Sequence, residues 1–299
     1  FLLALPALLL AAGCAVQPPA APMPPIVFVH GNGDTAALWQ TTLWRFESNG
    51  WPRSHLHAID MPYPLARDDD TKPQPGRSST AEHMAFLKAE VDKVRQATGA
   101  DKVVLIGNSR GGNAIRNYIQ NGGGVATVSH AILGGTPNHG VWSIAGFREA
   151  NECAGTGPFL KALNAPKNAA GDEVTGPVKW MTIRSDSNDK FAQPDGLWIG
   201  MAGKPTGVTA AGPELKGAHN VVIAGIDHRE TAFGPQAFAE RRLDDHLAQA
   251  QGPCIRRDQT QGRRGGDPRQ GEAPRHQQRT FQGVSQSIYR VEITIASSR

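Results

Sequence analysis

The residues most able to do chemistry lie around one serine between glycines. The stretch GNSRG (residues 107–111) follows the apolar run VVLI and precedes a segment of helical character. Gly-x-Ser-x-Gly between a strand and a helix is typical of a nucleophile elbow, a sharp turn that exposes a hydroxyl above the edge of a sheet. Glycines suit positions 107 and 111 because strand and helix pass too closely there for a Cβ, and the helix start favours negative charge near the hydroxyl. We therefore predict that Ser109 is a nucleophile, the alternative being a glycine-rich turn with an incidental serine.

A serine hydroxyl is a weak nucleophile until a base takes its proton, so a histidine must serve it. His228 follows the last apolar strand-like run and precedes the final helical segment, which is where the base of such a site is expected. Other histidines lie in or beside earlier elements (His55, His57 and His83) or near the end of the fourth strand-like run (His139). We predict that His228 is the general base.

The sequence offers more than one acid to orient that histidine. Asp186, Asp189 and Asp195 all follow the apolar run at 178–184, and an acid there gives the chain order Ser, acid, His. Asp186 lies in SDSN and Asp195 in PDG, which are both turn sequences. Asp189 stands where the loop could return toward His228. We favour Asp189, and the other two stay open.

Acyl transfer also needs hydrogen-bond donors for the oxyanion that develops during attack. HGNGD (residues 30–34) follows the first apolar run, and a turn at His30 and Gly31 would direct the Asn32 N–H toward the site. The backbone N–H of Arg110, directly after the serine, would be the second donor. Phosphate binding is the alternative for this glycine-rich loop, but it has neither the Walker lysine nor the dinucleotide-binding spacing.

The elements that must position these residues alternate between short apolar runs and helical segments. This alternation predicts an α/β fold, with a mostly parallel sheet of about six strands and helices on both faces. One helix has a capping-box start at Ser79 and Glu82 and a glycine stop at Gly99. The expected strands are 26–29, 56–60, 103–107, 131–135, 178–184 and 220–225, and the other expected helices are 36–48, 111–120 and 235–250.

Residues 141–177 differ from this pattern, because they are rich in Gly, Ala and Asn with scattered apolar side chains. Such a long connection is usually functional or disordered, and we expect it to pass over the ligand-facing edge of the sheet. Trp142, Ile144 and Phe147 would then line an acyl-binding site above Ser109. The alternative is that they pack as a small satellite core.

The N-terminal segment, residues 1–24, is interpreted as a signal peptide and spacer. Its apolar run is short for a membrane span and is followed by small residues. AAGC before a Pro/Ala-rich stretch resembles the lipobox of bacterial lipoproteins, which would make Cys14 a lipid-anchored residue; plain secretion after a small-residue cleavage site is the alternative. Both place the protein outside the cytoplasm, either secreted or periplasmic and at the outer surface.

The C-terminal segment, residues 255–299, is expected to be a basic, disordered tail. It holds nine Arg against four Asp and Glu, a local charge of +5 within a total of +4, so the remainder carries −1. Its low apolar content cannot support a packed core. A nearly neutral main body argues against a nucleic-acid partner.

Cysteine usage leaves two options open. Cys153 and Cys254 are the only thiols apart from Cys14. An even pair in an exported protein suggests a disulfide, and two unrelated free cysteines are the alternative.

Four stretches together resemble a known family: PIVFVHGNGD, GNSRGGNAIRNYI, HAILGGTPNHGV and GIDH. They are similar to the α/β-hydrolase superfamily and, within it, to small secreted bacterial lipases of the lipase class 2 type, over about residues 25–247. The resemblance implies a triad of Ser109, an Asp near 189 and His228, with oxyanion amides at Asn32 and Arg110. The elbow departs from the family pattern, since it carries Asn108 and Arg110 where these lipases usually have His and Met or Gln.

These observations predict an exported serine esterase or lipase with its hydrolase domain at 25–254, an ester or lipid substrate, and no metal or organic cofactor. A polyester depolymerase and a catalytically silent binding lipoprotein on the same fold are the alternatives. An intact Ser, acid and His argue against the silent binder. The acyl chain length and the oligomeric state stay open.

Overall fold

The structure is a computed structural model that describes residues 23–141, 149–186, 189 and 212–243. The chain divides into two units, residues 1–254 and 255–299, and every described residue lies in the first. The expected signal segment through residue 22, the proposed acyl-site residues Trp142, Ile144 and Phe147, the aspartate Asp195 and the expected tail lie outside the described residues.

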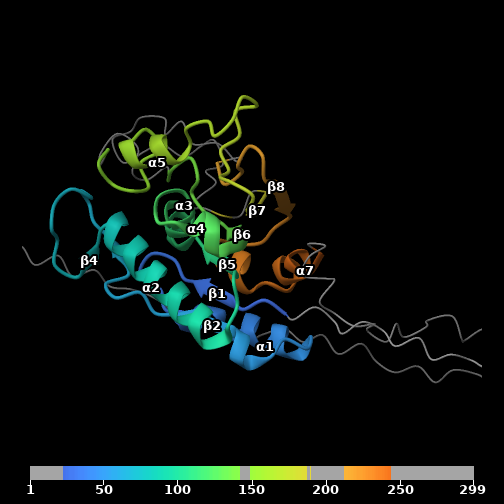
Figure 1. Ribbon diagram of the computed structural model, residues 1–299. Coiled ribbons are helices and arrows are strands. Elements are labelled where there is room, and N and C mark those ends of the chain that lie inside the picture. The colour runs from blue at the N-terminus through green and yellow to red at the C-terminus, as the bar shows by residue number, and fades with distance from the viewer. Residues whose placement is uncertain (1–22, 142–148, 187–188, 190–211, 244–299) are drawn as a thin grey trace, which may run out of the picture. The chain divides into compact units, whose positions relative to one another are not determined.

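One parallel sheet organises the described unit (Figure 1). Its strands pair in the order β2-β1-β5-β6-β7-β8, and every pairing is parallel. Because all six run the same way, the loops after their carboxyl ends meet at one edge, which is where open α/β sheets bind ligands. The prediction of a parallel α/β sheet is confirmed. The strands are β1 (Ile26–Val29), β2 (Leu56–Ile59), β5 (Val103–Asn108), β6 (Val128–Gly134), β7 (Lys179–Ser185) and β8 (His219–Ile223).

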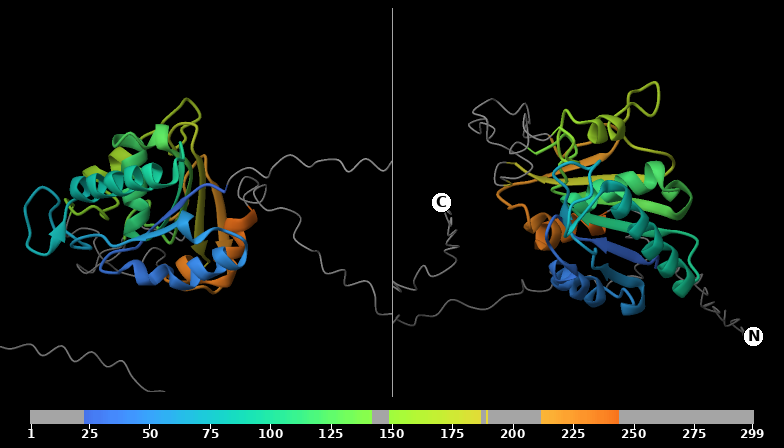
Figure 2. Two further views of the ribbon diagram at one scale, coloured as in Figure 1. Left: turned by 60° about the horizontal axis from the view of Figure 1, so that its bottom comes forward. Right: turned by 90° about the vertical axis from the view of Figure 1, so that its left-hand side faces the viewer.

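Helices cover both faces of the sheet because successive strand residues point to opposite sides. In β1, Val27 and Val29 pack with α2 (Thr80–Thr98) and α3 (Arg110–Asn121). Ile26 and Phe28 pack in the opposite cluster, which is covered by η1, α1 and α7. Figure 2 shows these helices on the two sides of the strands. The second layer comprises η1 (Ala36–Trp39), α1 (Gln40–Ser48), α6 (Glu230–Phe233) and α7 (Pro235–Leu243).

The boundaries of α2 follow the chemistry expected at its ends. The Ser79 side chain accepts the Glu82 N–H, and the Glu82 carboxylate accepts the Ser79 N–H, so the capping box is complete. At the other end, Gly99 adopts the left-handed conformation with φ of 69°. Both predicted helix signals are therefore confirmed.

The structure contains several short elements that were not predicted from the sequence. The connection from β2 to α2 holds a small two-stranded sheet, β3 (Leu65–Ala66) with β4 (Arg77–Ser78). The connection at 141–177, expected as one long loop, contains the helix α5 (Pro158–Leu163). Elements of so few residues show too little periodicity to be predicted. The remaining short helices are η2 (Arg53–His55) and α4 (Gly124–Thr127).

Three further features of the described residues complete the fold. Cys153 is a buried free thiol, and Cys254, its proposed disulfide partner, lies outside the described residues. The described part of the chain contains no helix that is long and apolar enough to cross a membrane.

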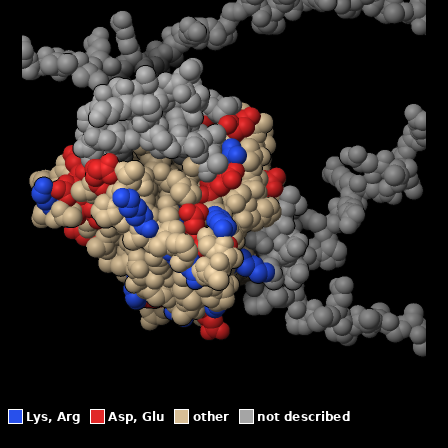
Figure 3. All heavy atoms as spheres, turned by 90° about the horizontal axis from the view of Figure 1, so that it is seen from above, with Lys and Arg blue, Asp and Glu red and all other residues tan. Residues whose placement is uncertain are grey.

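On the face seen in Figure 3, the described side chains are mainly uncharged, with acidic and basic groups interspersed.

Candidate active site

Ser109 occupies a strained turn between β5 and α3. It is one of two described non-glycine residues with positive φ, at 54°, and it stands at the N-cap of α3. A Cβ on Gly107 would lie 2.8 Å from the Gly112 nitrogen, and one on Gly111 would lie 2.7 Å from the His30 carbonyl oxygen. Such contacts are too short for real Cβ atoms. The tight geometry explains why glycine flanks the serine, as the sequence pattern predicts.

The structure brings His228 and Asp189 together, 39 residues apart in the chain. His228 Nδ1 lies 2.8 Å from Asp189 Oδ2, and the Asp189 side chain is fully buried. Because a carboxylate accepts but cannot donate, Nδ1 carries the proton and Nε2 is left as the basic nitrogen. Asp186 has a different environment: it is exposed, and its Oδ1 accepts the Gly225 N–H at 2.9 Å.

Asn108 connects the histidine loop to the serine turn. Its side-chain amide donates to the His228 carbonyl oxygen at 3.2 Å and to Thr231 Oγ1 at 2.9 Å. Thr231 Oγ1 in turn donates to the His228 carbonyl oxygen at 2.7 Å. Since Asn108 directly precedes Ser109, these bonds hold the backbone of His228 to the elbow. In the sequence, Asn108 stands out only as a departure from the family pattern, and no local signal indicates this role.

Two glycines at the carboxyl end of β6, its last residue Gly134 and the following Gly135, leave space for this arrangement. A Cβ on Gly135 would lie 3.1 Å from both Asp189 Oδ2 and His228 Nδ1, and Gly135 has φ of 55°. A Cβ on Gly134 would lie 2.6 Å from the Thr231 carbonyl oxygen. Any side chain at 134 or 135 would therefore press on the acid–histidine pair or the turn beneath it.

The loop after β1 lies against the serine. The Met61 N–H donates to His30 Nε2 at 3.0 Å, so His30 donates from Nδ1 to the Gly31 carbonyl oxygen at 2.9 Å. Burial lowers the pKa of His30, which agrees with this neutral ring. A Cβ on Gly31 would lie 3.0 Å from the Ser109 Cβ. The residue that follows, Asn32, is thus brought close to the nucleophile.

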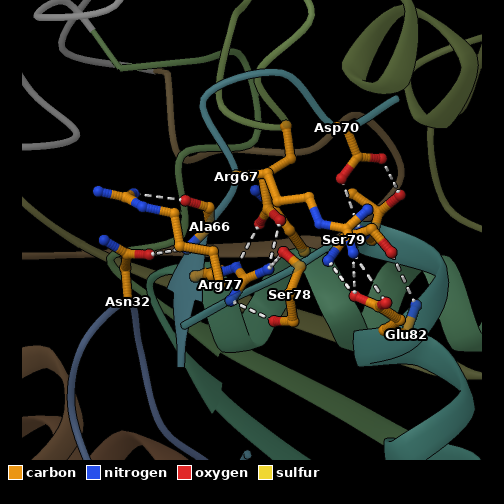
Figure 4. Close-up of polar contacts among 12 residues, drawn as sticks. Asn32, Ala66, Arg67, Asp70, Arg77, Ser78, Ser79 and Glu82 are labelled. Carbon is orange, nitrogen blue, oxygen red and sulfur yellow. Dashed lines mark hydrogen bonds and ion pairs between the residues drawn. The ribbon is translucent and has the colours of Figure 1, made fainter. Parts of the chain in front are cut away.

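The two predicted oxyanion donors share one property. Among the described residues, neither the Asn32 N–H nor the Arg110 N–H has a protein acceptor. Arg110 is the first residue of α3, where an N–H has no partner inside its own helix. The Asn32 side chain is engaged elsewhere, since its Oδ1 accepts the Ala66 N–H at 2.7 Å (Figure 4).

The arrangement of these residues defines a class of protein. A serine on a strand–turn–helix elbow, a His–Asp pair on later loops of a parallel sheet, and a glycine loop beside the serine are the parts of an α/β hydrolase. Groups of three or more side chains suited to a metal ion are not found among the described residues.

Part of the sequence and the fold are similar to those of known lipases. The sequence profile of the family "Lipase (class 2)" matches residues 23–158. The fold is similar to the mature form of Bacillus licheniformis lipase BlEst2, with 22% identity, a TM-score of 0.52, and coverage of 75% of this chain and 93% of that one. It is also similar to Aspergillus fumigatus lipase B, with 15% identity, a TM-score of 0.53, and coverage of 75% and 52%.

These comparisons confirm the resemblance to α/β hydrolases and bacterial lipases. The family match supports an ester hydrolase as the general class of activity. The matched residues include the elbow and the loop after β1, and they end before Asp189 and His228.

Proposed function

We propose that this protein hydrolyses carboxylic esters through an acyl-enzyme on Ser109, with His228 as general base and Asp189 as its orienting acid. The observation that carries the proposal is the 2.8 Å bond from His228 Nδ1 to the fully buried Asp189 carboxylate. A buried carboxylate is unfavourable without a partner, and here its partner is the histidine that the serine needs.

The chemistry follows from this arrangement. His228 Nε2 takes the proton of Ser109 Oγ as the oxygen attacks the ester carbonyl carbon, and Asp189 stabilises the imidazolium that forms. The oxyanion is bound by the backbone N–H groups of Asn32 and Arg110, and the N-terminus of α3 adds favourable potential. His228 then protonates the departing alcohol. His228 Nε2 next takes a proton from water as the water oxygen attacks the acyl carbonyl carbon. The bond from this carbon to Ser109 Oγ then breaks, His228 returns the proton to Oγ, and the carboxylic acid is released.

The proposal includes an ester or lipid substrate and export from the cytoplasm. The N-terminal segment that motivates export, and the residues Trp142, Ile144 and Phe147 proposed to line the acyl site, lie outside the described residues. Both parts therefore rest on the sequence. Hydrolysis of p-nitrophenyl esters from acetate to palmitate, beside a polyester emulsion, would define the acyl preference and test the depolymerase alternative.

The central test is Ser109→Ala. We expect turnover of the preferred ester to fall by roughly 10⁶-fold, as for loss of a catalytic serine in a well-studied protease. A fluorophosphonate probe should label the wild-type protein at Ser109 and leave the variant unlabelled.

Ser129→Ala is the matched control, because Ser129 lies at the start of β6 and donates to the Val103 carbonyl oxygen, at the opposite end of the sheet from the elbow. It should keep its activity and its labelling. A folded wild-type protein that neither hydrolyses any ester nor reacts with the probe would contradict the proposal and favour a silent binding protein.

A further inference from the structure

The residue after the nucleophile has an unusual side chain for its position. The Arg110 guanidinium is buried at 1% exposure, and all five of its N–H groups are used. Nε and Nη2 donate to the two carboxylate oxygens of Glu152 at 2.9 and 2.8 Å, and Glu152 is itself 2% exposed. The remaining bonds go to the Pro64 carbonyl oxygen at 2.9 Å and to Ser78 Oγ and the Ser78 carbonyl oxygen at 3.1 and 2.8 Å.

One acceptor of Arg110 is shared with the other side of the site. The Pro64 carbonyl oxygen accepts Arg110 Nη1 and also accepts the Gly33 N–H at 3.2 Å. Gly33 directly follows Asn32. The segments that supply the two oxyanion donors, Asn32 and Arg110, are thus joined through one carbonyl group.

A second path joins the same segments. The Ala66 N–H binds Asn32 Oδ1 at 2.7 Å, and the Ala66 carbonyl oxygen accepts Arg77 Nη1 at 2.6 Å. Arg77 pairs with Leu65 in the small β3–β4 sheet and directly precedes Ser78, the third partner of Arg110. Figure 4 shows Asn32, Ala66, Arg77 and Ser78 gathered in this cluster.

The cluster is anchored to α2. Arg67 Nη2 bonds both carboxylate oxygens of Glu82 at 2.8 and 3.0 Å, and Glu82 closes the capping box with Ser79. Asp70 accepts the N–H and the hydroxyl of Thr80 at 2.8 and 2.6 Å. The connection from β2 to α2 is therefore fixed to the sheet edge at one side and to a 19-residue helix at the other.

We propose that Glu152 and the Arg110 side chain are positioning residues that set the separation of the two oxyanion N–H groups through the Pro64 carbonyl. This inference rests on the proposed function. A hydrogen-bond donor contributes to catalysis only if it is held where the oxyanion will form, and misplacement by about 1 Å can cost about 10²-fold in rate.

The energetic character of the pair agrees with a positioning role. Desolvation raises the pKa of Glu152, and the charge of Arg110 acts in the opposite direction. Replacing a buried ion pair with apolar side chains often leaves a protein equally or more stable, so stability alone does not account for such a pair. Its five directed bonds instead specify geometry at the elbow.

Two variants test the inference. Glu152→Gln weakens the hold on Arg110, and the double variant Arg110→Met with Glu152→Leu removes the link to Pro64 without leaving a buried charge unpaired. For both we expect kcat for the preferred p-nitrophenyl ester to fall about 10- to 100-fold with KM within about threefold, because donors are displaced rather than lost. The double variant keeps the test open if Glu152→Gln fails to fold.

A second readout separates positioning from general damage. A thionoester presents a sulfur that accepts hydrogen bonds weakly, so it gains less from two oriented N–H groups. The ratio of kcat/KM for the oxygen ester to that for its thionoester should therefore fall in both variants. Arg116→Gln is the matched control, since Arg116 is another buried arginine of α3 but bonds Asn138, Leu163 and Asn164. It should leave both kcat and the ratio unchanged.

The outcomes are distinct. A folded double variant with wild-type kcat and an unchanged ratio would overturn this inference while the proposed function stands. A fall in thermal midpoint with no change in the ratio would assign the pair a purely structural role and would overturn it as well. A wild-type protein without ester hydrolysis would overturn the proposed function and this inference with it.

Discussion

Asp189 and Asp186 lie three residues apart and have opposite environments. Asp189 is fully buried against His228, whereas Asp186 is exposed and accepts the Gly225 N–H. A buried carboxylate must be paired, and pairing with Nδ1 fixes the tautomer that leaves Nε2 basic. At the scale of single residues, this difference in burial separates an acid that can orient the base from one that stabilises a turn.

We predict that Asp189→Asn lowers kcat by about 10⁴-fold, because the amide favours the wrong histidine tautomer. The thermal midpoint should change little, since Asn has nearly the same shape. Asp186→Asn, the matched control on the same loop, should keep kcat within a few-fold of the wild type. Steady-state kinetics with a p-nitrophenyl ester would measure both, and near-full activity of Asp189→Asn would remove it from the proposed triad.

At the scale of elements, the crossing of β1 and α3 determines what the elbow tolerates. A Cβ on Gly111 would meet the carbonyl oxygens of both Val29 and His30, and these are backbone atoms that cannot rotate away. In an unobstructed helix, replacing Gly with Ala stabilises the helix by about 1 kcal/mol. The close approach of strand and helix reverses that expectation here.

Gly111→Ala should therefore lower the thermal midpoint and abolish fluorophosphonate labelling, because α3 must move away from β1 and carry Ser109 with it. Gly99→Ala is the comparison, since its Cβ would meet no atom within 4 Å. It should cost only about 1–2 kcal/mol for the left-handed backbone, with labelling intact. Thermal melts and labelling of the two purified variants would check this; equal stability of Gly111→Ala and wild type would show that the elbow can relax.

At the scale of the molecule, His139 ties together three connections around the sheet. Its Nδ1 lies 2.8 Å from the Gly212 carbonyl oxygen and its Nε2 2.8 Å from Glu173 Oε1. Glu173 Oε2 accepts the Lys216 N–H at 2.9 Å. The segments after β6, before β7 and before β8 thus meet on one ion pair.

This ion pair should make stability depend on pH. The hydrogen bond to Glu173 raises the pKa of His139 above its ordinary 6.5. The contribution of protonated His139 to the free energy of unfolding is therefore complete below about pH 6.5 and is lost as pH rises through the raised pKa. For Glu173, desolvation acts to raise the pKa, but the bonds from His139 and the Lys216 N–H outweigh it, and the pKa falls below the ordinary 4.5. The contribution of ionised Glu173 to the free energy of unfolding is present above about pH 4.5 and is lost as pH falls through the lowered pKa.

We therefore predict that Glu173→Gln lowers the thermal midpoint more at about pH 5.5 than at about pH 9, because the charged pair exists fully only in the acidic window. Asp92→Asn on α2 is the control, because Asp92 pairs with Lys88 and no histidine takes part in that ion pair. Its effect should be the same at both pH values. A Glu173→Gln effect that does not change with pH would contradict the prediction.

Local patterns were sufficient for much of this molecule. The six strands, the capping box at Ser79 and the glycine-flanked turn at Ser109 depend on hydrophobic runs and on chemistry between residues a few positions apart. The sequence could therefore predict the parallel α/β fold, the elbow and the need for a later base. The functional roles of Ser109, Asp189 and His228 stay predictions that the variants above would test.

Only the tertiary structure determined the contacts between loops that are distant in the sequence. The residues by themselves left three aspartates open, because loop conformation is not periodic, and only the folded chain brings Asp189 to His228. For Arg110, likewise, the sequence predicts a role for the backbone N–H and none for the side chain. That side chain bonds Glu152 and Pro64, which lie 42 and 46 residues from Arg110 in the sequence. No local pattern encodes such pairings, because they arise only when the sheet brings its loops to one edge.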